Sequence, residues 1–314
     1  MKSERKDGRP RAVMLSKRAN VFYLERCRVL QKDERVVYLT DSGQDIERYF
    51  NIPDKNTLFL MLGTGTSISS SAIRKLSESN VIVGFCGSGG SPLTAAVDQT
   101  FVLPQDEYRP THYAQAWFAM WQEDSQRLTL GKRLLAVRVQ WTLKGWQANG
   151  DSPPNRLVES FSSQYEKANT STDLLLAEAR WAKQLYGFMA DCYDVSFVRE
   201  PGQKGLESSG GRINRLIDHG NYLAYGYAAA VLHGLGIPFS LPVLHGKTRR
   251  GGLVFDVADL IKDAHILPLA FEMCRKPSKG LEKEFRSAVI ERIREHNVVD
   301  QLFEKIEELC EREI

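Results

Sequence analysis

The chain has 314 residues, of which 42% are hydrophobic and 26% are charged, as in soluble globular proteins with one large domain or two ordinary ones. Its formal net charge of +3 excludes a strongly basic protein of the histone kind, so any nucleic-acid binding must come from local patches. Five scattered cysteines without a C-x-x-C pair predict free buried thiols in a reducing cytoplasm: Cys27, Cys86, Cys192, Cys274 and Cys310.

The N-terminal third is predicted to be rich in β-strands. Residues 1–12 form a charged tail without the apolar core of a secretory signal, and we expect this tail to be disordered. Short runs of β-branched and aromatic residues, separated by turn signals, predict strands at 36–40, 57–62 and 81–86. Between the last two strands, the apolar spacing predicts a short amphipathic helix at 69–79.

Two glycine-rich segments of this part could suggest a nucleotide site. Residues 62–67 lack the lysine of a P-loop, and residues 84–90 follow a strand but do not open a helix. Both are therefore predicted to be turns. The sequence also lacks a G-x-S-x-G motif, and no cysteine lies in a clearly electropositive segment, so neither a serine nor a cysteine nucleophile is favoured.

The hydrophobic period changes to that of helices after residues 104–110, where two prolines and mixed charges predict a linker. A mobile surface loop is expected at 200–211. Helices are predicted at 111–126, 128–146, 156–168, 172–193, 213–235, 254–263, 264–275, 280–295 and 297–312. The sequence therefore predicts an α+β protein with a small β-rich domain at 1–103 and a larger all-α domain at 111–314.

Residues 222–244 are the one segment apolar and long enough to suggest a bilayer span. The segment contains His233, Pro238 and Pro242 as well as glycines, which favours a buried helix that ends before Pro238. We therefore expect no membrane association.

A stripe of acids near the C-terminal end is the first candidate site. Asp256, Asp259 and Asp263 stand at i, i+3 and i+7, so they share one face of a helix whose other residues are apolar. The stripe is either a solvated acidic face or a cluster that a divalent metal or nearby cations neutralise.

A basic loop precedes the stripe. Lys247, Arg249 and Arg250 lie between His245 and a glycine pair. Glycines allow the backbone to approach a phosphate, and arginine forks match phosphate oxygens, so phosphate binding is favoured over an ordinary surface loop.

Other polar residues remain ambiguous on the sequence alone. Glu178 lies in an apolar helical segment, where a solvated neighbour of Lys183 is the favoured interpretation and a buried acid near Asp256 is the alternative. Tyr222 and Tyr225 are more typical of a core than of a catalytic site. The position of His219 permits either role.

Several segments together resemble a known family, the CRISPR-associated spacer-integration nucleases that are the universal adaptation subunit, and within it the subtype I-F branch. The spacing Glu…His-x10-Asp-x2-Asp is the specific part of this resemblance. The segments that carry it are 16–20, 62–67, 72–74, the helix around Glu178, 221–227, 245–247 and 255–262.

The resemblance implies a β-sandwich-like N-terminal domain and a helical C-terminal domain. It implies a Mg²⁺ or Mn²⁺ site formed by Glu178, His245 and Asp256, with Asp259 as a further catalytic residue. Asp263 is then left as a surface residue. Lys247, Arg249, Arg250 and Lys262 are the expected DNA contacts, mostly to phosphate.

The resemblance also implies the reaction and the partners. A DNA 3′-hydroxyl would attack a phosphodiester and so insert a short foreign duplex into a repeat array, or water would cleave the DNA. A cytoplasmic homodimer formed through the β domain would assemble with a small ferredoxin-like subunit, which in this subtype is fused to a helicase-nuclease. The alternatives are a non-catalytic DNA-binding scaffold and a stand-alone metal-dependent repair nuclease.

Overall fold

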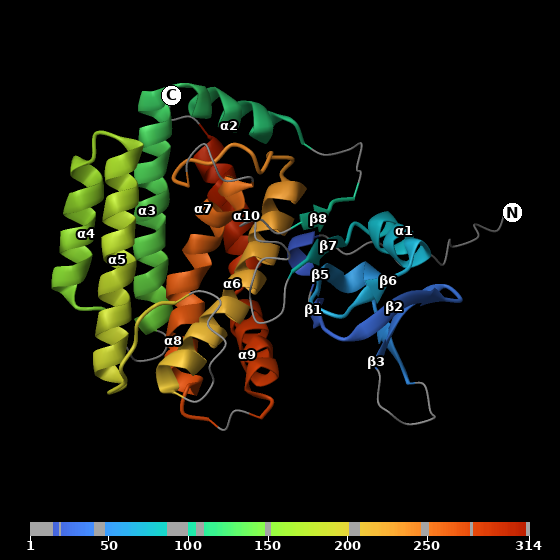
Figure 1. The fold of residues 1–314 in the computed structure, drawn as a ribbon. Helices are drawn as coiled ribbons and strands as arrows, with labels where there is room; N and C mark the ends of the chain where they lie inside the picture. Colours follow the sequence, from blue (N-terminus) through green and yellow to red (C-terminus); the bar gives the residue numbers. More distant parts are fainter. Residues whose placement is uncertain are drawn as a thin grey trace, which may run out of the picture.

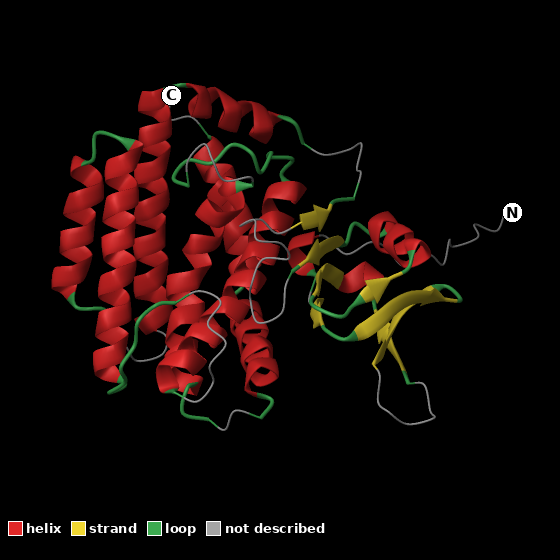
Figure 2. Cartoon of the chain, in the orientation of Figure 1, coloured by secondary structure: helices red, strands yellow, loops and turns green. Residues whose placement is uncertain are grey.

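The computed structural model describes residues 15–18, 20–40, 48–86, 100–104, 110–147, 152–200, 208–245, 251–276 and 279–311. Its strands gather in a small part at one side, and a larger helical part occupies the other side (Figures 1 and 2). The predicted α+β class is confirmed.

The β part contains two four-stranded sheets with the strand orders β1-β5-β7-β8 and β4-β3-β2-β6. The three predicted strands are confirmed as β3 (Arg35–Thr40), β5 (Thr57–Leu62) and β7 (Ile82–Phe85). The other described strands were not predicted: β1 (Asn20–Leu24), β2 (Cys27–Lys32), β4 (Tyr49–Ile52), β6 (Ser67–Ile68) and β8 (Thr100–Val102). The predicted short helix is α1 (Ser70–Glu78), whose N-terminus is capped by the Ser69 hydroxyl, which accepts the Ala72 N–H at 3.2 Å.

The helical part follows the predicted order closely. The predicted helix at 111–126 is divided, because the chain becomes extended at Glu123 between α2 and α3. The elements are α2 (His112–Gln122), α3 (Asp124–Gln147), α4 (Asn155–Lys167), α5 (Ser171–Cys192), α6 (Ser209–Gly234), α7 (Gly252–Ile261), η4 (Lys262–Ile266), α8 (Leu267–Met273), α9 (Leu281–Glu295) and α10 (Val298–Cys310). Of the loop predicted at 200–211, residues 201–207 lie outside the described part, and Ser209 already begins α6.

The predicted boundary between helices at 263 and 264 does not occur. Instead, α7 continues through the π-helical turn η4 into α8 without leaving the helical region of backbone angles. A π-helical turn inserts an extra residue and rotates the side chains that follow. The acid stripe therefore runs from α7 into this turn.

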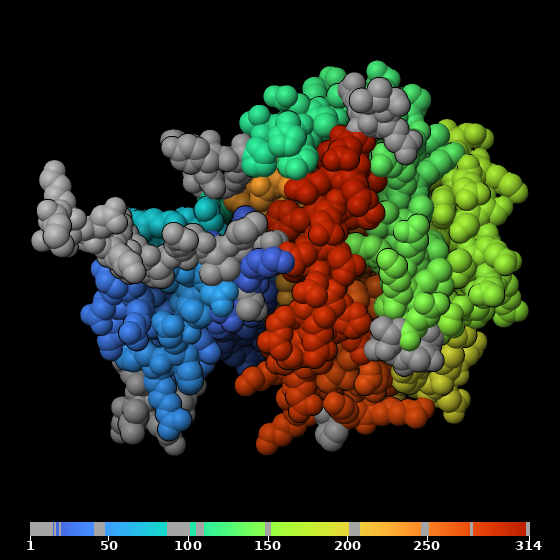
Figure 3. Space-filling view, turned by 180° about the vertical axis from the view of Figure 1, so that it is seen from behind, coloured from blue at the N-terminus to red at the C-terminus, as the bar shows by residue number. Residues whose placement is uncertain are grey.

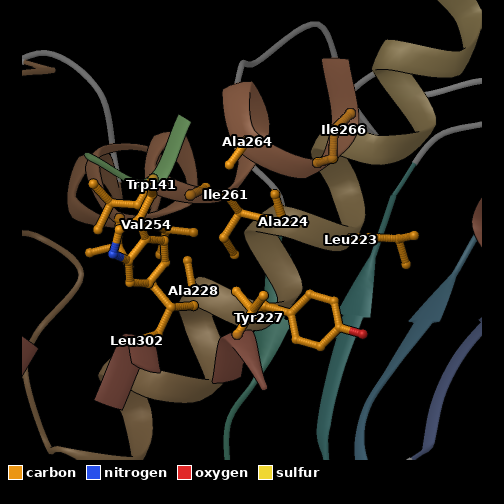
Figure 4. Close-up of a cluster of buried hydrophobic side chains, with 14 of the residues drawn as sticks. Trp141, Leu223, Ala224, Tyr227, Ala228, Val254, Ile261, Ala264, Ile266 and Leu302 are labelled. Carbon is orange, nitrogen blue, oxygen red and sulfur yellow. The ribbon is translucent and has the colours of Figure 1, made fainter. Parts of the chain in front are cut away.

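Helix α6 is the centre of the molecule, and nearly all of its residues are buried. Side chains from α3, α6, α7, η4 and α10 gather around it in one apolar cluster (Figure 4). The helix predicted at 213–235 is confirmed as a buried core helix. Among the described residues, no helix is long and apolar enough to cross a membrane.

Strand β5 joins the two parts. Phe59 packs edge-on against Tyr227 of α6, with ring centroids 5.0 Å apart, and a Cβ added at Gly226 would lie 2.5 Å from the Phe59 ring. Leu60 and Leu62, by contrast, belong to the core between the two sheets. The strand thus contributes to both cores. From behind, α9 and α10 form the surface between the strands and the outer helices (Figure 3).

The cysteines form no disulfide. All five are free, as predicted, and four of them are buried, while Cys192 at the end of α5 is exposed.

Candidate active site

Asp256 is a buried anchor for the segment that carries His245. Its Oδ2 accepts the backbone N–H groups of Val243 at 2.5 Å and Leu244 at 3.1 Å. Its Oδ1 accepts the backbone N–H of His245 at 3.1 Å and lies 2.7 Å from the His245 Nδ1. Because an ionised carboxylate can only accept, Nδ1 carries the proton and the neutral ring keeps its lone pair on Nε2.

The same segment is held from its other side by two tryptophans of α2. Trp117 Nε1 donates to the Leu241 carbonyl at 3.1 Å, and Trp121 Nε1 donates to the Pro242 carbonyl at 2.8 Å. The imidazole of His245 is therefore fixed in position by both α2 and α7.

The pKa of His245 is raised above its ordinary value. Burial alone would lower this pKa, but the hydrogen bond to Asp256 and the charges of Asp259 and Asp256 stabilise the imidazolium more strongly.

Asp259, one turn after Asp256, faces the open nitrogen of the histidine. Its Oδ2 lies 3.9 Å from His245 Nε2 and 3.4 Å from an Nη1 donor of Arg138, while its Oδ1 accepts from Lys262 at 2.6 Å. Burial would raise the pKa of Asp259, but the charges of Lys262 and Arg138 outweigh burial and lower the pKa. Asp259 is thus a buried carboxylate flanked by the cationic groups of Lys262 and Arg138.

Arg138 of α3 connects acids from α5, α7 and η4, a role that the sequence analysis did not predict. Its Nη1 donates to Glu178 Oε1 of α5 at 2.9 Å as well as to Asp259. Its Nε and Nη2 donate to the two oxygens of Asp263 at 2.6 and 3.2 Å. Glu178 is therefore close to the acid stripe, which corresponds to the alternative that the residues alone did not favour.

Asp263 is not a surface residue, contrary to the prediction. It is 6% exposed and accepts from Trp181 Nε1 at 2.9 Å in addition to Arg138. Trp146 Nε1 donates to its backbone carbonyl at 2.7 Å. The whole acid stripe points inward because α3 and α5, which supply these donors, pack against that face.

Lys262, expected as a DNA contact, has its ammonium group inside the site. Besides Asp259, it contacts the Tyr225 hydroxyl at 3.2 Å and lies 4.5 Å from the centre of the Tyr225 ring. The acid Asp259 raises the pKa of Lys262 despite its burial. The other expected DNA contacts, Lys247, Arg249 and Arg250, lie outside the described residues.

The donors of this site match a divalent ion of the Mg²⁺ or Mn²⁺ type. Within the described ranges, no three histidine, cysteine or acidic side chains already stand at metal-binding separations. Glu178 Oε1 and Asp259 Oδ2 both accept from Arg138 Nη1, and His245 Nε2 lies 3.9 Å from the same Asp259 oxygen. Hard oxygens with one imidazole suit these ions. Four acids face only two permanent cations, Arg138 and Lys262, which leaves a formal excess of two negative charges.

This chain is similar to several known proteins. The family model described as CRISPR associated protein Cas1 matches residues 22–293. The CRISPR-associated endonuclease Cas1 of Pseudomonas aeruginosa is 41% identical, over 96% of this chain and 96% of its own length.

Solved structures show the same fold at low sequence identity. A Cas1 protein from Thermotoga maritima matches with a TM-score of 0.74 at 14% identity, over 92% of this chain and 95% of its own. A casposase bound to its integration product matches with a TM-score of 0.72 at 13% identity, over 92% and 90% of the two chains.

Proposed function

This chain belongs to the Cas1 family of CRISPR-associated proteins, and we propose that it is a metal-dependent DNA endonuclease and integrase of CRISPR adaptation. The observation that carries the proposal is that Arg138 Nη1 connects Glu178 to Asp259 Oδ2, while His245 Nε2 lies 3.9 Å from the same Asp259 oxygen. The relative with 41% identity is called an endonuclease, which supports the same class of reaction. This relative matches over 96% of both chains, so the class of reaction is proposed for the whole chain.

Glu178, His245 and Asp259 are the residues that would hold a Mg²⁺ or Mn²⁺ ion. This set departs from the sequence-based one, in which Asp256 was the ligand. Both oxygens of Asp256 are already engaged by backbone N–H groups and by His245 Nδ1, so we assign Asp256 to positioning the histidine.

The reaction that fits these residues is attack on a phosphodiester. When bound, an ion of this type would polarise the phosphodiester and stabilise the attacking oxygen, a DNA 3′-hydroxyl in strand transfer or water in cleavage, and the cut strand would leave with a free hydroxyl end. Lys262 keeps a positive charge next to Asp259, close to where a phosphate would lie. Tyr225 and Asp259 fix the position of that ammonium group, so it can balance developing charge without rearranging.

The partners of this reaction follow from the family and stay proposals. The protein would act in the cytoplasm as a homodimer formed through the β part, together with a small ferredoxin-like subunit fused to a helicase-nuclease. Its DNA substrates would be a short duplex and a repeat array, held mostly by phosphate contacts of Lys247, Arg249 and Arg250.

A strand-transfer assay with Mn²⁺ and labelled DNA tests the proposal. We expect transfer by the wild-type protein and none above background by Glu178→Ala or Asp259→Ala, with DNA binding retained. Asp191→Ala, which removes an exposed acid from the same helix as Glu178, is the matched control and should remain active. No transfer above background by any of the four proteins, with DNA binding retained, would instead support a non-catalytic DNA-binding scaffold. Equal transfer by all four proteins would refute the assignment of Glu178 and Asp259 to the site.

A stand-alone repair nuclease, the other alternative, is distinguished from an integrase by whether the reaction requires the partner subunit. An integrase of this family should need the ferredoxin-like subunit for insertion into a repeat. A repair nuclease should cleave branched DNA equally well without it.

A further inference from the structure

Arg138 stands out because its guanidinium group has two different sides. Nε and Nη2 form a fork on Asp263, and Nη1 reaches the opposite way to Glu178 and Asp259. The residue is 3% exposed. One cation therefore compensates three carboxylates, two of which belong to the proposed metal site.

The Asp263 side is built to be permanent. The distances of 2.6 and 3.2 Å to its two oxygens describe a two-pronged, charge-assisted pair, the strongest arrangement that arginine forms with a carboxylate. Trp181 fixes one of these oxygens, and Trp146 fixes the backbone carbonyl of the same residue. Asp263 is thus held by helices α3 and α5 whether or not Nη1 keeps its contacts.

The Nη1 side is weaker and lies where an ion would have to be. Nη1 is 2.9 Å from Glu178 and 3.4 Å from Asp259, so it stands between two of the three proposed ligands. Burying these acids without a cation would be costly, so in the ion-free protein Nη1 serves that purpose. An ion bound by both carboxylates would occupy the space of this contact.

We propose that Arg138 is an internal counter-cation of the active site, which a divalent ion displaces from Glu178 and Asp259 while Asp263 retains the guanidinium group. This inference rests on the proposed metal site and adds a positioning residue to it. When no ion is bound, Arg138 shields Glu178 and Asp259 from solvent and holds them in place. It also competes with the ion, and so it sets the ion concentration at which the site fills.

The test is the affinity for Mn²⁺ itself, measured without DNA by calorimetry or by the loss of the free-ion EPR signal. Arg138→Gln removes the competing charge, and we expect it to bind Mn²⁺ about tenfold more tightly. Arg138→Lys keeps the charge but has one ammonium group in place of the fork, so it cannot hold Asp263 and Glu178 together. We expect this variant to bind Mn²⁺ at least about threefold more tightly.

The controls separate competition from a general effect of charge. Arg133→Gln removes an arginine from the same helix α3 whose Nη2 donates to the Glu308 carbonyl of α10, outside the site, and it should bind Mn²⁺ like the wild type. Melting temperatures with and without Mn²⁺ give a second measurement. The increase caused by Mn²⁺ should be larger in both Arg138 variants than in the wild type, because their ion-free site lacks full compensation.

Each outcome decides a different claim. If both Arg138 variants bind Mn²⁺ as weakly as the wild type or more weakly, Arg138 only supports the structure and the inference fails. An Arg133→Gln protein that gains as much affinity as Arg138→Gln would also overturn it. If the wild-type protein binds no Mn²⁺ at all, the proposed metal site fails first and the inference with it.

Discussion

Two of the polar clusters among the described residues differ in the balance of their charges. The site cluster consists of Arg138, Glu178, Asp259, Lys262 and Asp263, between α3, α5 and the α7–η4 segment. The junction cluster consists of Tyr23, Glu25, His219 and Arg286, where β1 meets α6 and α9.

The junction cluster has one acid and one arginine. Tyr23 donates to Glu25 at 2.6 Å, and the Arg286 guanidinium lies 4.4 Å from the centre of the Tyr23 ring. An Nη1 of Arg286 lies 3.2 Å from His219 Nδ1, while His219 Nε2 has no partner among the described residues. Burial first, and then the charges of Arg286 and Arg215, lower the pKa of His219 to about 3.

The difference in charge balance distinguishes a cluster that stabilises the fold from one that is suited to catalysis. The junction cluster is balanced and keeps its histidine neutral, as suits a contact that holds a sheet against two helices. The site cluster has an excess of acid, and His245 Nε2 beside it lies 3.9 Å from the Asp259 carboxylate. Such an excess of buried acid is a poor way to stabilise a fold and a good way to hold an ion. The following substitutions should affect the two clusters differently.

The largest effect is expected from Asp259→Ala. This change removes a proposed ligand and leaves Lys262 without its acid, and it should reduce Mn²⁺-dependent strand transfer by at least about 100-fold. Quantified strand-transfer rates and a melting curve measure activity and folding separately. A variant that folds and keeps more than a third of wild-type activity would contradict the assignment.

Asp256→Asn should have the next largest effect. It keeps the size of the side chain but weakens the acceptor that orients His245. Losing such a partner of a metal-binding histidine should reduce activity about 10- to 100-fold. The decisive comparison is with Asp259→Asn under the same conditions. A larger loss at position 256 than at 259 would restore Asp256 as the ligand.

Two glycines of α6 allow a matched pair of packing changes. An added Cβ would lie 2.3 Å from Ile266 of η4 in Gly220→Ala, and 2.5 Å from Phe59 of β5 in Gly226→Ala. Each change should lower the free energy of unfolding by about 1–3 kcal/mol, as measured by urea denaturation.

Only the first of these changes pushes on the segment that carries Lys262 and Asp263. Gly220→Ala should therefore also weaken Mn²⁺ binding, whereas Gly226→Ala should leave the binding per folded molecule unchanged. The separation of the two regions would be refuted if Gly226→Ala disturbed Mn²⁺ binding more than Gly220→Ala.

The smallest effect concerns pH and the junction cluster. In the unfolded chain, His219 becomes protonated as the pH falls below its ordinary pKa of 6.5. In the folded protein the pKa of His219 is lowered to about 3, so folding stability decreases as the pH falls between these two values. At pH 5.5 this residue should cost about 1 kcal/mol of stability relative to pH 8. His219→Asn does not titrate there and should lose correspondingly less stability between the two pH values.

Denaturation of both proteins at pH 8 and 5.5 measures this difference. His265, whose pKa burial also lowers to about 3, remains in both proteins and therefore cancels. The exposed His112 provides the control substitution His112→Asn. Identical losses in wild type and His219→Asn would show that the histidine is not held neutral.

The helices were predictable and several strands were not, for a physical reason. A helix such as α5 repeats its apolar face over many turns, so its period is clear from the sequence. Strands β2 and β4 contain too few buried apolar residues for a clear signal: β2 includes Arg28, Gln31 and Lys32, and three of the four residues of β4 are exposed.

The site was predictable only in part. The acid stripe and His245 lie near each other in the sequence, and the spacing of a known family added Glu178. Arg138 could not be found because it lies 121 residues before Asp259 on a helix with an ordinary pattern. The division of roles between Asp256 and Asp259 depends on the backbone N–H groups of residues 243–245, which no side-chain pattern reports.

The central claim is that Glu178, His245 and Asp259 hold a divalent ion and Asp256 does not. Anomalous diffraction from crystals soaked in Mn²⁺ tests this claim most directly. The account predicts one peak within bonding distance of a Glu178 oxygen, His245 Nε2 and an Asp259 oxygen, with Arg138 still paired to Asp263. A peak bound by Asp256, or no peak near these residues at a saturating Mn²⁺ concentration, would contradict it.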